Sequence, residues 1–249
     1  MSDTFGRARR LLFPLALVGL AVLTGAGSGI PPADAARKPN MTEGIDVSHW
    51  QGRIDWADVA RSGKKFAFIK VTEGTTFLDK KYATYHANAR AAGVVVGGYH
   101  YAQPNANPGD AIAEAEWFVS NLALTYGDMR PALDLETANG LDVPTLQQWV
   151  RDWLARVHEL TGQHATIYVS RAFWRDRVGN TTEAALGGSA LWLSKWNVKS
   201  PETWLPADDW AGYGWSFWQY SGCGSVRGID GCVDLDRFNG TDLTPFLVD

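Results

Sequence analysis

Asp134 and Glu136, at the end of a short apolar run, are the strongest candidates for chemistry in this sequence. Residues two apart in a β-strand point to the same face, about 6.6 Å apart along it at the usual rise. Two carboxyl groups this close disfavour joint ionisation, so the pKa of one is expected to rise. Such a carboxyl can donate a proton near neutral pH while its neighbour stays charged, as acid-catalysed cleavage of a glycosidic bond requires. Taken alone, an Asp-x-Glu pattern is more typical of a solvated strand end, and its position after the apolar run Ala132-Leu133 is what favours the catalytic interpretation.

Two more acids, Asp46 and Asp234, lie in similar short apolar runs. Each is a candidate for a further acid facing the same pocket, and each is equally suited to capping a turn. Glu73 and Lys70 are expected to form an ion pair that holds strand ends together.

Aromatic and amide side chains near predicted strand ends are candidates for binding a sugar. Aromatic rings can stack on the apolar faces of sugar rings, whereas most of the 12 Trp, including Trp149 and Trp153 on a helical stripe, are expected in the core. The candidate binding residues are Tyr99, Tyr101, Trp196, Trp218 and Gln219.

Strand and helix patterns alternate through the first two thirds of the chain. The strand-like runs are Gly44–Val47, Phe66–Val71, Val94–Tyr101, Ala132–Leu135 and Ala165–Val169, with helical patterns at about 55–62, 79–92, 108–126, 143–161 and 171–178. This alternation predicts a parallel sheet with right-handed crossovers. Three later strands, at Ala190–Ser194, Trp215–Tyr220 and Val233–Asp236, have no long helical stripe between them. Eight strands predict a single-domain α/β fold, a TIM-like barrel whose last third lacks helices, with an open doubly wound sheet as the alternative.

The helix over 143–161 has the most complete set of end signals. Asp142 can cap its N-terminus, Pro144 suits its first turn and Gly162 can end it. Gly97 and Gly98 lie within the third strand-like run, and we expect them to mark a site where neighbouring groups pack closely against the backbone.

Composition and motifs exclude several classes of function. The 249 residues carry a formal charge of −4, so no general basic field attracts nucleic acid, and nucleic acid is not an expected partner. There is no H-E-x-x-H and no His pair at i, i+4, and no metal site is expected. Gly-x-Ser-x-Gly, P-loop and G-x-G-x-x-G motifs are also absent from the sequence, and no cofactor is expected.

The N-terminus is typical of a secretory signal. Three Arg precede the apolar stretch Leu11 to Leu23, and Ala33-Asp34-Ala35 supplies a small-x-small cleavage pattern. We therefore expect a signal peptide over 1–35, a flexible leader over 36–42 and one catalytic domain over 43–249, secreted and without stable membrane insertion after cleavage. In an exported chain Cys223 and Cys232 are expected to form a disulfide that stabilises by roughly 2–3 kcal/mol.

Six stretches taken together resemble glycoside hydrolase family 25, the Chalaropsis-type lysozymes. They are Gly44-Ile-Asp-Val-Ser-His-Trp-Gln-Gly52, Phe68-Ile-Lys-Val-Thr-Glu-Gly74, Gly97-Gly-Tyr-His-Tyr101, Ala132-Leu-Asp-Leu-Glu136, Phe217-Trp-Gln-Tyr220 and Val233-Asp-Leu-Asp-Arg-Phe238. The resemblance runs from about Gly44 to Phe246 and implies a flattened (β/α)5β3 barrel. The chain departs from the family's pattern in having Val71 for the usual Ala and Asp236 for a frequent Asn, which adds negative charge near the rim.

The resemblance implies hydrolysis of the β-1,4 bond between N-acetylmuramic acid and N-acetylglucosamine in bacterial peptidoglycan. It places Glu136 on the general acid, Asp134 on its partner carboxylate, and Asp46 and Asp234 on two further acids of the pocket. A wall-binding protein that no longer cuts, and a chitinase-like hydrolase, remain alternatives. A monomer is the default expectation for a small exported hydrolase.

Overall fold

The structure is a computed structural model that describes residues 41–249. The expected signal peptide and residues 36–40 of the expected leader lie outside the described residues. Eight strands form the barrel, and a short strand β3 (Phe77–Leu78) pairs with the end of β2. The barrel strands are β1 (Thr42–Val47), β2 (Phe66–Glu73), β4 (Val95–Tyr101), β5 (Ala132–Asp134), β6 (Thr166–Ser170), β7 (Ala190–Ser194), β8 (Phe217–Gly224) and β9 (Val233–Phe238).

Pairing of β1 on both sides closes the barrel. β1 pairs with β2 in parallel and with β9 in antiparallel orientation. The barrel strands β2, β4, β5, β6, β7 and β8 follow in parallel, and β9 is antiparallel to β8. The closed barrel is confirmed, and the open doubly wound sheet is excluded.

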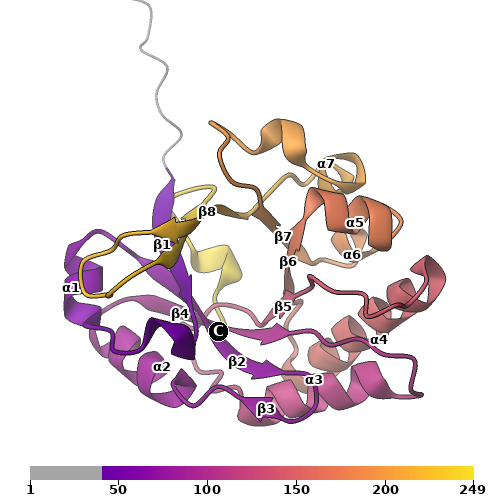
Figure 1. Cartoon of the computed structure of the whole chain (residues 1–249), viewed down its shortest axis with the longest axis horizontal. Helices are drawn as coiled ribbons and strands as arrows, with labels where there is room; N and C mark the ends of the chain where they lie inside the picture. Colours follow the sequence, from indigo (N-terminus) through magenta and orange to yellow (C-terminus); the bar gives the residue numbers. More distant parts are fainter. Residues whose placement is uncertain (1–40) are drawn as a thin grey trace, which may run out of the picture. The chain divides into compact units, whose positions relative to one another are not determined.

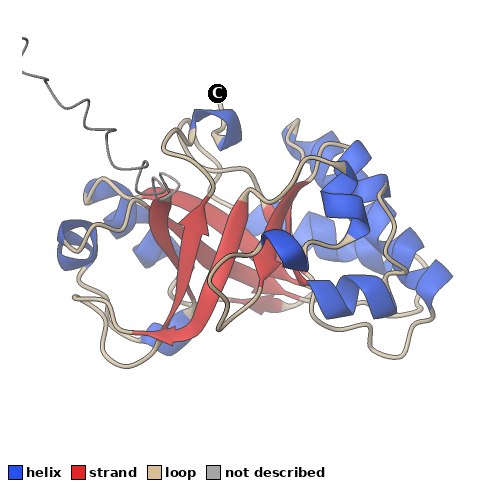
Figure 2. Cartoon of the chain, turned by 90° about the horizontal axis from the view of Figure 1, so that it is seen from above, coloured by secondary structure: helices blue, strands red, loops and turns tan. Residues whose placement is uncertain are grey.

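Helices pack around the outside of the strands (Figures 1 and 2). The longest, α4, has the expected ends: the side chain of Asp142 accepts a hydrogen bond from the Thr145 N–H, and Gly162 ends the helix in a left-handed conformation. The helices are α1 (Trp56–Arg61), α2 (Tyr82–Ala91), α3 (Asp110–Asn121), α4 (Val143–Thr161), α5 (Arg171–Arg177), α6 (Glu183–Leu186) and the left-handed turn α7 (Ala207–Ala211). Within residues 41–249, no helix is both long and apolar enough to cross a bilayer.

Alternate residues of each strand supply two separate cores. One core fills the barrel and includes Phe68, Tyr168 and Trp192, while the other lies between the barrel and the helices and includes Leu133, Trp149 and Trp153. Close packing also explains the two glycines of β4. A Cβ at Gly97 would lie 2.9 Å from the Phe68 ring, and one at Gly98 would lie 2.4 Å from Leu122.

Several local features differ from the sequence prediction. β1 begins at Thr42, inside the expected leader, because Thr42 pairs with Phe238 of β9. β8 runs on to Gly224 because the hairpin to β9 continues its pairing as far as Gly224 and Val233. The last third contains two short helices, α6 and α7, which are too short to produce a helical stripe.

Candidate active site

A cavity of about 370 Å³ opens at the carboxyl ends of the barrel strands. Parallel α/β barrels place their active sites at this end. Eight of the nine predicted catalytic and binding residues line this cavity: Asp46, Tyr99, Tyr101, Asp134, Glu136, Trp196, Gln219 and Asp234.

Strand register brings residues from distant parts of the chain to one level of the barrel. Tyr101 is paired with Asp134, and Asp134 with Tyr168, so β4, β5 and β6 present one row to the cavity. Across the closure, Asp46 lies directly opposite Asp234. The four predicted acids therefore meet although almost 190 residues separate the first from the last.

Asp134 and Glu136 line the same cavity, Asp134 in the wall and Glu136 closer to solvent. Asp134 is 7% exposed, and burial together with the charge of Glu136 holds its pKa well above the usual range. Burial also raises the pKa of Glu136. Both pKa values are thus raised, so each carboxyl group holds a proton more readily than an ordinary exposed Asp or Glu. Among the described residues, Oδ1 of Asp134 is buried without a hydrogen-bond partner.

Three acids from β1 and β9 form a second group beside this pair. Burial raises the pKa of Asp46 well above its usual range, and the nearby charge of Asp236 adds to the effect. Burial also raises the pKa of Asp234 to about 8 and that of Asp236 to about 7. Asp236 does not lie at the rim as the sequence suggested. It is fully buried and does not line the cavity, and its Oδ1 accepts a hydrogen bond of 2.8 Å from the Trp192 indole.

Gln219 connects the acids to the aromatic side of the cavity. Its Nε2 donates to Oδ2 of Asp46 at 2.8 Å. Its Oε1 accepts from the Tyr168 hydroxyl and the Trp196 indole, each at 2.9 Å. Gln219 is 3% exposed, so these bonds fix its amide and the orientation of Asp46.

The aromatic residues divide between the wall and the mouth of the cavity. Tyr99 is buried in the wall, whereas Trp196 is 48% exposed and offers a face to a ligand. Trp218 is not brought to the cavity: it is 1% exposed, and its indole donates to the Lys195 carbonyl at 2.6 Å. Because Trp218 cannot stack on a sugar in this position, it is left out of the candidate binding residues.

Lys70 is the one cation among the residues that line this cavity. Its Nζ donates to Glu73 at 2.6 Å, so the predicted ion pair forms, and it also lies 4.7 Å from the centre of the Tyr101 ring. The positive charge opposes the rise in the pKa of Asp134 and of Glu136. Lys70 therefore has two roles: it pairs with Glu73 at the end of β2, and it limits the rise in the pKa values of Asp134 and Glu136.

Sequence reasoning missed three aromatic lining residues. Tyr168 and Trp192 lie at inward-facing positions of β6 and β7, and Trp50 at the mouth is 81% exposed. Alternation along each strand assigns Tyr168 and Trp192 to one of two faces, but only the register between strands, in which Tyr168 pairs with Asp134, shows that Tyr168 faces the cavity.

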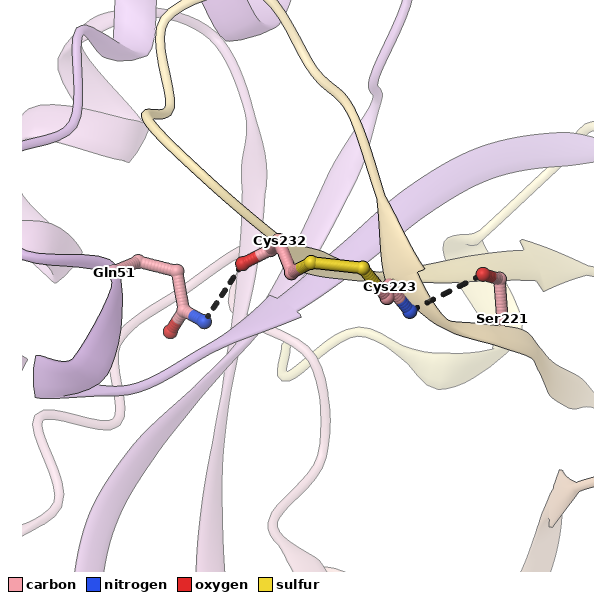
Figure 3. The surroundings of a disulfide bond; sticks show 4 residues. All are labelled: Gln51, Ser221, Cys223 and Cys232. Atoms are coloured by element: carbon pink, nitrogen blue, oxygen red, sulfur yellow. Dashed lines mark hydrogen bonds between the residues drawn. A yellow bond between two sulfur atoms is a disulfide. The ribbon is translucent and has the colours of Figure 1, made fainter.

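The predicted disulfide joins Cys223 and Cys232 across the β8–β9 hairpin (Figure 3). The Cys232 carbonyl accepts a hydrogen bond of 3.4 Å from Nε2 of Gln51, which ties the hairpin to the segment after β1. Gly222 and Asp234, on either side of the bridge, line the cavity. The disulfide therefore braces one wall of the candidate active site.

This arrangement can perform acid–base chemistry on a neutral, ring-shaped ligand. Carboxyl groups with raised pKa values can hold and deliver a proton, and the exposed aromatic residues at the mouth can hold the ligand against them.

Comparisons with known proteins agree with this chemistry. Residues 45–229 match the family model described as glycosyl hydrolases family 25, a range that holds Asp46, Asp134 and Glu136 and ends before Asp234. Lysozyme M1 of Streptomyces globisporus is 36% identical over 239 residues, covering 90% of this chain and 77% of that protein. The N,O-diacetylmuramidase of Chalaropsis sp. is 28% identical, covering 77% of this chain and 95% of that protein. The crystal structure of a bacterial lysozyme from Streptomyces coelicolor superposes with a TM-score of 0.74 at 34% identity, covering 82% of this chain and 94% of that one.

Proposed function

The chain belongs to glycosyl hydrolase family 25 and is a peptidoglycan-hydrolysing muramidase, and on this premise we propose that Glu136 is its general acid and Asp134 its partner carboxylate. The reaction is hydrolysis of the β-1,4 bond between N-acetylmuramic acid and N-acetylglucosamine. The observation that carries the assignment is that Asp134 and Glu136 line one cavity at the strand ends, with the pKa of each raised.

In the first step Glu136 protonates the oxygen of the leaving sugar. The raised pKa of its carboxyl supports this role, because an ordinary glutamate would be almost fully ionised at neutral pH. Its position near solvent also suits a group that meets both the substrate and the attacking water.

Asp134 orients the 2-acetamido group of the substrate. Asp134 lines the cavity beside Glu136, which places its carboxyl group to accept a hydrogen bond from the acetamido N–H. The acetamido carbonyl oxygen then attacks the anomeric carbon as the glycosidic bond breaks, which gives an oxazolinium ion. Water opens this ion and transfers a proton to Glu136, so the starting protonation state is restored.

Asp46 and Asp234 form the opposite wall of the same pocket. Gln219 holds Asp46 in place, and the raised pKa of Asp234, about 8, keeps it mostly protonated at neutral pH. A protonated carboxyl can donate a hydrogen bond to a sugar hydroxyl. Together with Tyr99, Tyr101 and Trp196 these residues would bind the sugar beside the acid pair.

We further propose that the protein is exported and acts as a monomer on the wall outside the cell. The disulfide supports export, because such bonds persist in oxidising compartments. The signal-like sequence of residues 1–35 points the same way.

Replacement of the proposed acid tests the mechanism directly. We expect Glu136→Gln to remove nearly all turnover of purified cell walls in a turbidity assay, with an unchanged unfolding transition. Glu159→Gln, an exposed glutamate on α4, is the matched control and should retain full activity. If Glu136→Gln stays within tenfold of the natural protein, which is about 1.4 kcal/mol of barrier, the assignment of the acid is wrong.

Two further measurements refine the reaction. NMR of the first-formed anomer should show the β product, since attack by the acetamido group followed by water retains the configuration, and an α product would refute this route. Chitin oligomers should be cleaved much more slowly than peptidoglycan glycan, and equal rates would favour the chitinase-like alternative.

A further inference from the structure

A second and larger cavity, of about 570 Å³, adjoins the acidic one. Trp196 lines both, so its indole forms a shared wall. The second cavity, which we call the basic groove, is lined by Ser170, Arg171, Ala172, Arg175, Ser194, Lys195, Trp196, Asn197 and Trp204.

The basic groove and the catalytic cavity are lined by ionisable residues of opposite type. Its lining includes Arg171, Arg175 and Lys195 and no acidic residue, whereas four acids and one lysine line the catalytic cavity. A groove lined by three cations, beside a cavity whose acids have raised pKa values, indicates a ligand that has both an anionic and a neutral part.

Strand topology places these cations at the catalytic end of the barrel. Ser170 and Ser194 are register partners at the ends of β6 and β7. Arg171 and Lys195 follow them directly, so both are anchored to rigid strands rather than to a long loop.

Among the three basic side chains of the groove, those of Arg171 and Lys195 are not neutralised by an acidic partner within the described residues. Arg175 is engaged by Asp176, through bonds of 2.6 and 2.8 Å. The side chains of Arg171 and Lys195 form no ion pair with any residue of 41–249. The Nζ of Lys195 lies 3.7 Å from the centre of the Trp204 ring, which holds the ammonium at the wall of the groove.

We propose that the basic groove binds carboxylates of the short peptides that peptidoglycan carries on its N-acetylmuramic acid residues. The proposal rests on the proposed function, because a glycan held in the catalytic cavity presents these peptides at its edges. A guanidinium and an ammonium group recognise carboxylates well, whereas the one cation that lines the catalytic cavity, Lys70, is already engaged by Glu73. The two cavities would then bind the two parts of one substrate, the sugar in the catalytic cavity and the peptide in the basic groove.

Matched substrates that differ only in peptide charge provide the test. Two muropeptide tetrasaccharides are compared, one with free peptide carboxylates and one with the same groups converted to carboxamides. The natural protein should cleave the free-acid substrate with a kcat/KM about fivefold to tenfold higher, as expected for two partly exposed charge pairs. The preference should shrink as salt rises from about 0.05 to 0.5 M.

Variants of the groove connect this preference to its residues. Arg171→Gln with Lys195→Gln should abolish the preference and leave the kcat/KM for the carboxamide substrate unchanged, while Arg171→Lys with Lys195→Arg should retain it. Lys65→Ala removes an exposed charge just before β2, at the opposite end of the barrel, and should change neither value.

Three results would overturn the proposal. The natural protein could cleave the two substrates at equal rates, or the preference could survive in the Arg171→Gln, Lys195→Gln variant. The third is that this variant loses activity only on walls that carry phosphate polymers. Failure of the natural protein to cleave either tetrasaccharide would instead contradict the proposed function. The two failures are therefore distinguishable.

Discussion

The buried carboxyl of Asp236 leads to a quantitative prediction about stability and pH. Asp236 is fully buried beside Asp46, and its Oδ2 has no hydrogen-bond partner among the described residues. Burial raises its pKa from 3.8 to about 7. Replacing Asp236 by Asn removes the ionisation and keeps an oxygen that can accept the Trp192 indole hydrogen bond.

The sign of the effect follows from the direction of the shift. A carboxyl whose pKa is raised on folding contributes its full stability below the unfolded pKa and loses it as pH rises through the folded pKa. The difference between 3.8 and about 7 corresponds to at most about 4 kcal/mol. The Asp236→Asn variant should therefore match the natural protein near pH 4 and exceed it by up to about 4 kcal/mol at pH 8.

Urea unfolding at pH 4, 6 and 8, followed by tryptophan fluorescence, measures this gap. Asp236→Asn also removes the charge that helps to raise the pKa of neighbouring Asp46, so the measured gap belongs to this pair of carboxyl groups rather than to Asp236 alone. Asp230→Asn, an exposed acid in the disulfide-bridged segment, is the control and should show no pH-dependent gap. A gap that is the same at every pH, or an Asp236→Asn variant that is less stable at pH 8, would refute the reasoning.

Three further predictions concern the supports of the site. Cys223→Ser with Cys232→Ser should lower the free energy of unfolding by roughly 2–3 kcal/mol in urea titrations, and an unchanged value would mean that the bridge contributes nothing to stability. Gly222→Ala should raise KM several-fold while sparing stability, because an added Cβ would lie 2.6 Å from the Trp196 ring and displace it; unaltered steady-state kinetics would speak against a role for Trp196. Glu114→Ala should cost about 1–3 kcal/mol in the same urea assay, because Oε2 of Glu114 lies 2.7 Å from Nε2 of buried His100 and accepts the Gln103 N–H. Exposed Glu159→Ala is its control, and equal losses in the two variants would contradict the assigned bonds.

Much of the candidate site could be predicted from the sequence because its residues lie at the ends of recognisable strands. Asp46, Asp134 and Glu136 follow short apolar runs, and parallel strands bring their carboxyl ends to one edge. The prediction that both Trp218 and Gln219 line the cavity conflicts with the alternation of residues along a strand. Adjacent strand residues face opposite sides, so Trp218 and Gln219 could not both face the cavity.

The sequence by itself determined the order of the eight barrel strands and of the helices up to α5, the acids at strand ends and the pair of cysteines, since each depends on neighbours within a few residues. Only the tertiary structure decided that Asp236 is buried beneath Asp46, that Gln219 holds Asp46, and that Arg171 and Lys195 line a groove beside the acids. The physical reason is that the barrel strands are buried on both faces. Their hydrophobic pattern therefore does not distinguish inside from outside, and the depth of a carboxyl depends on register between strands far apart in the chain.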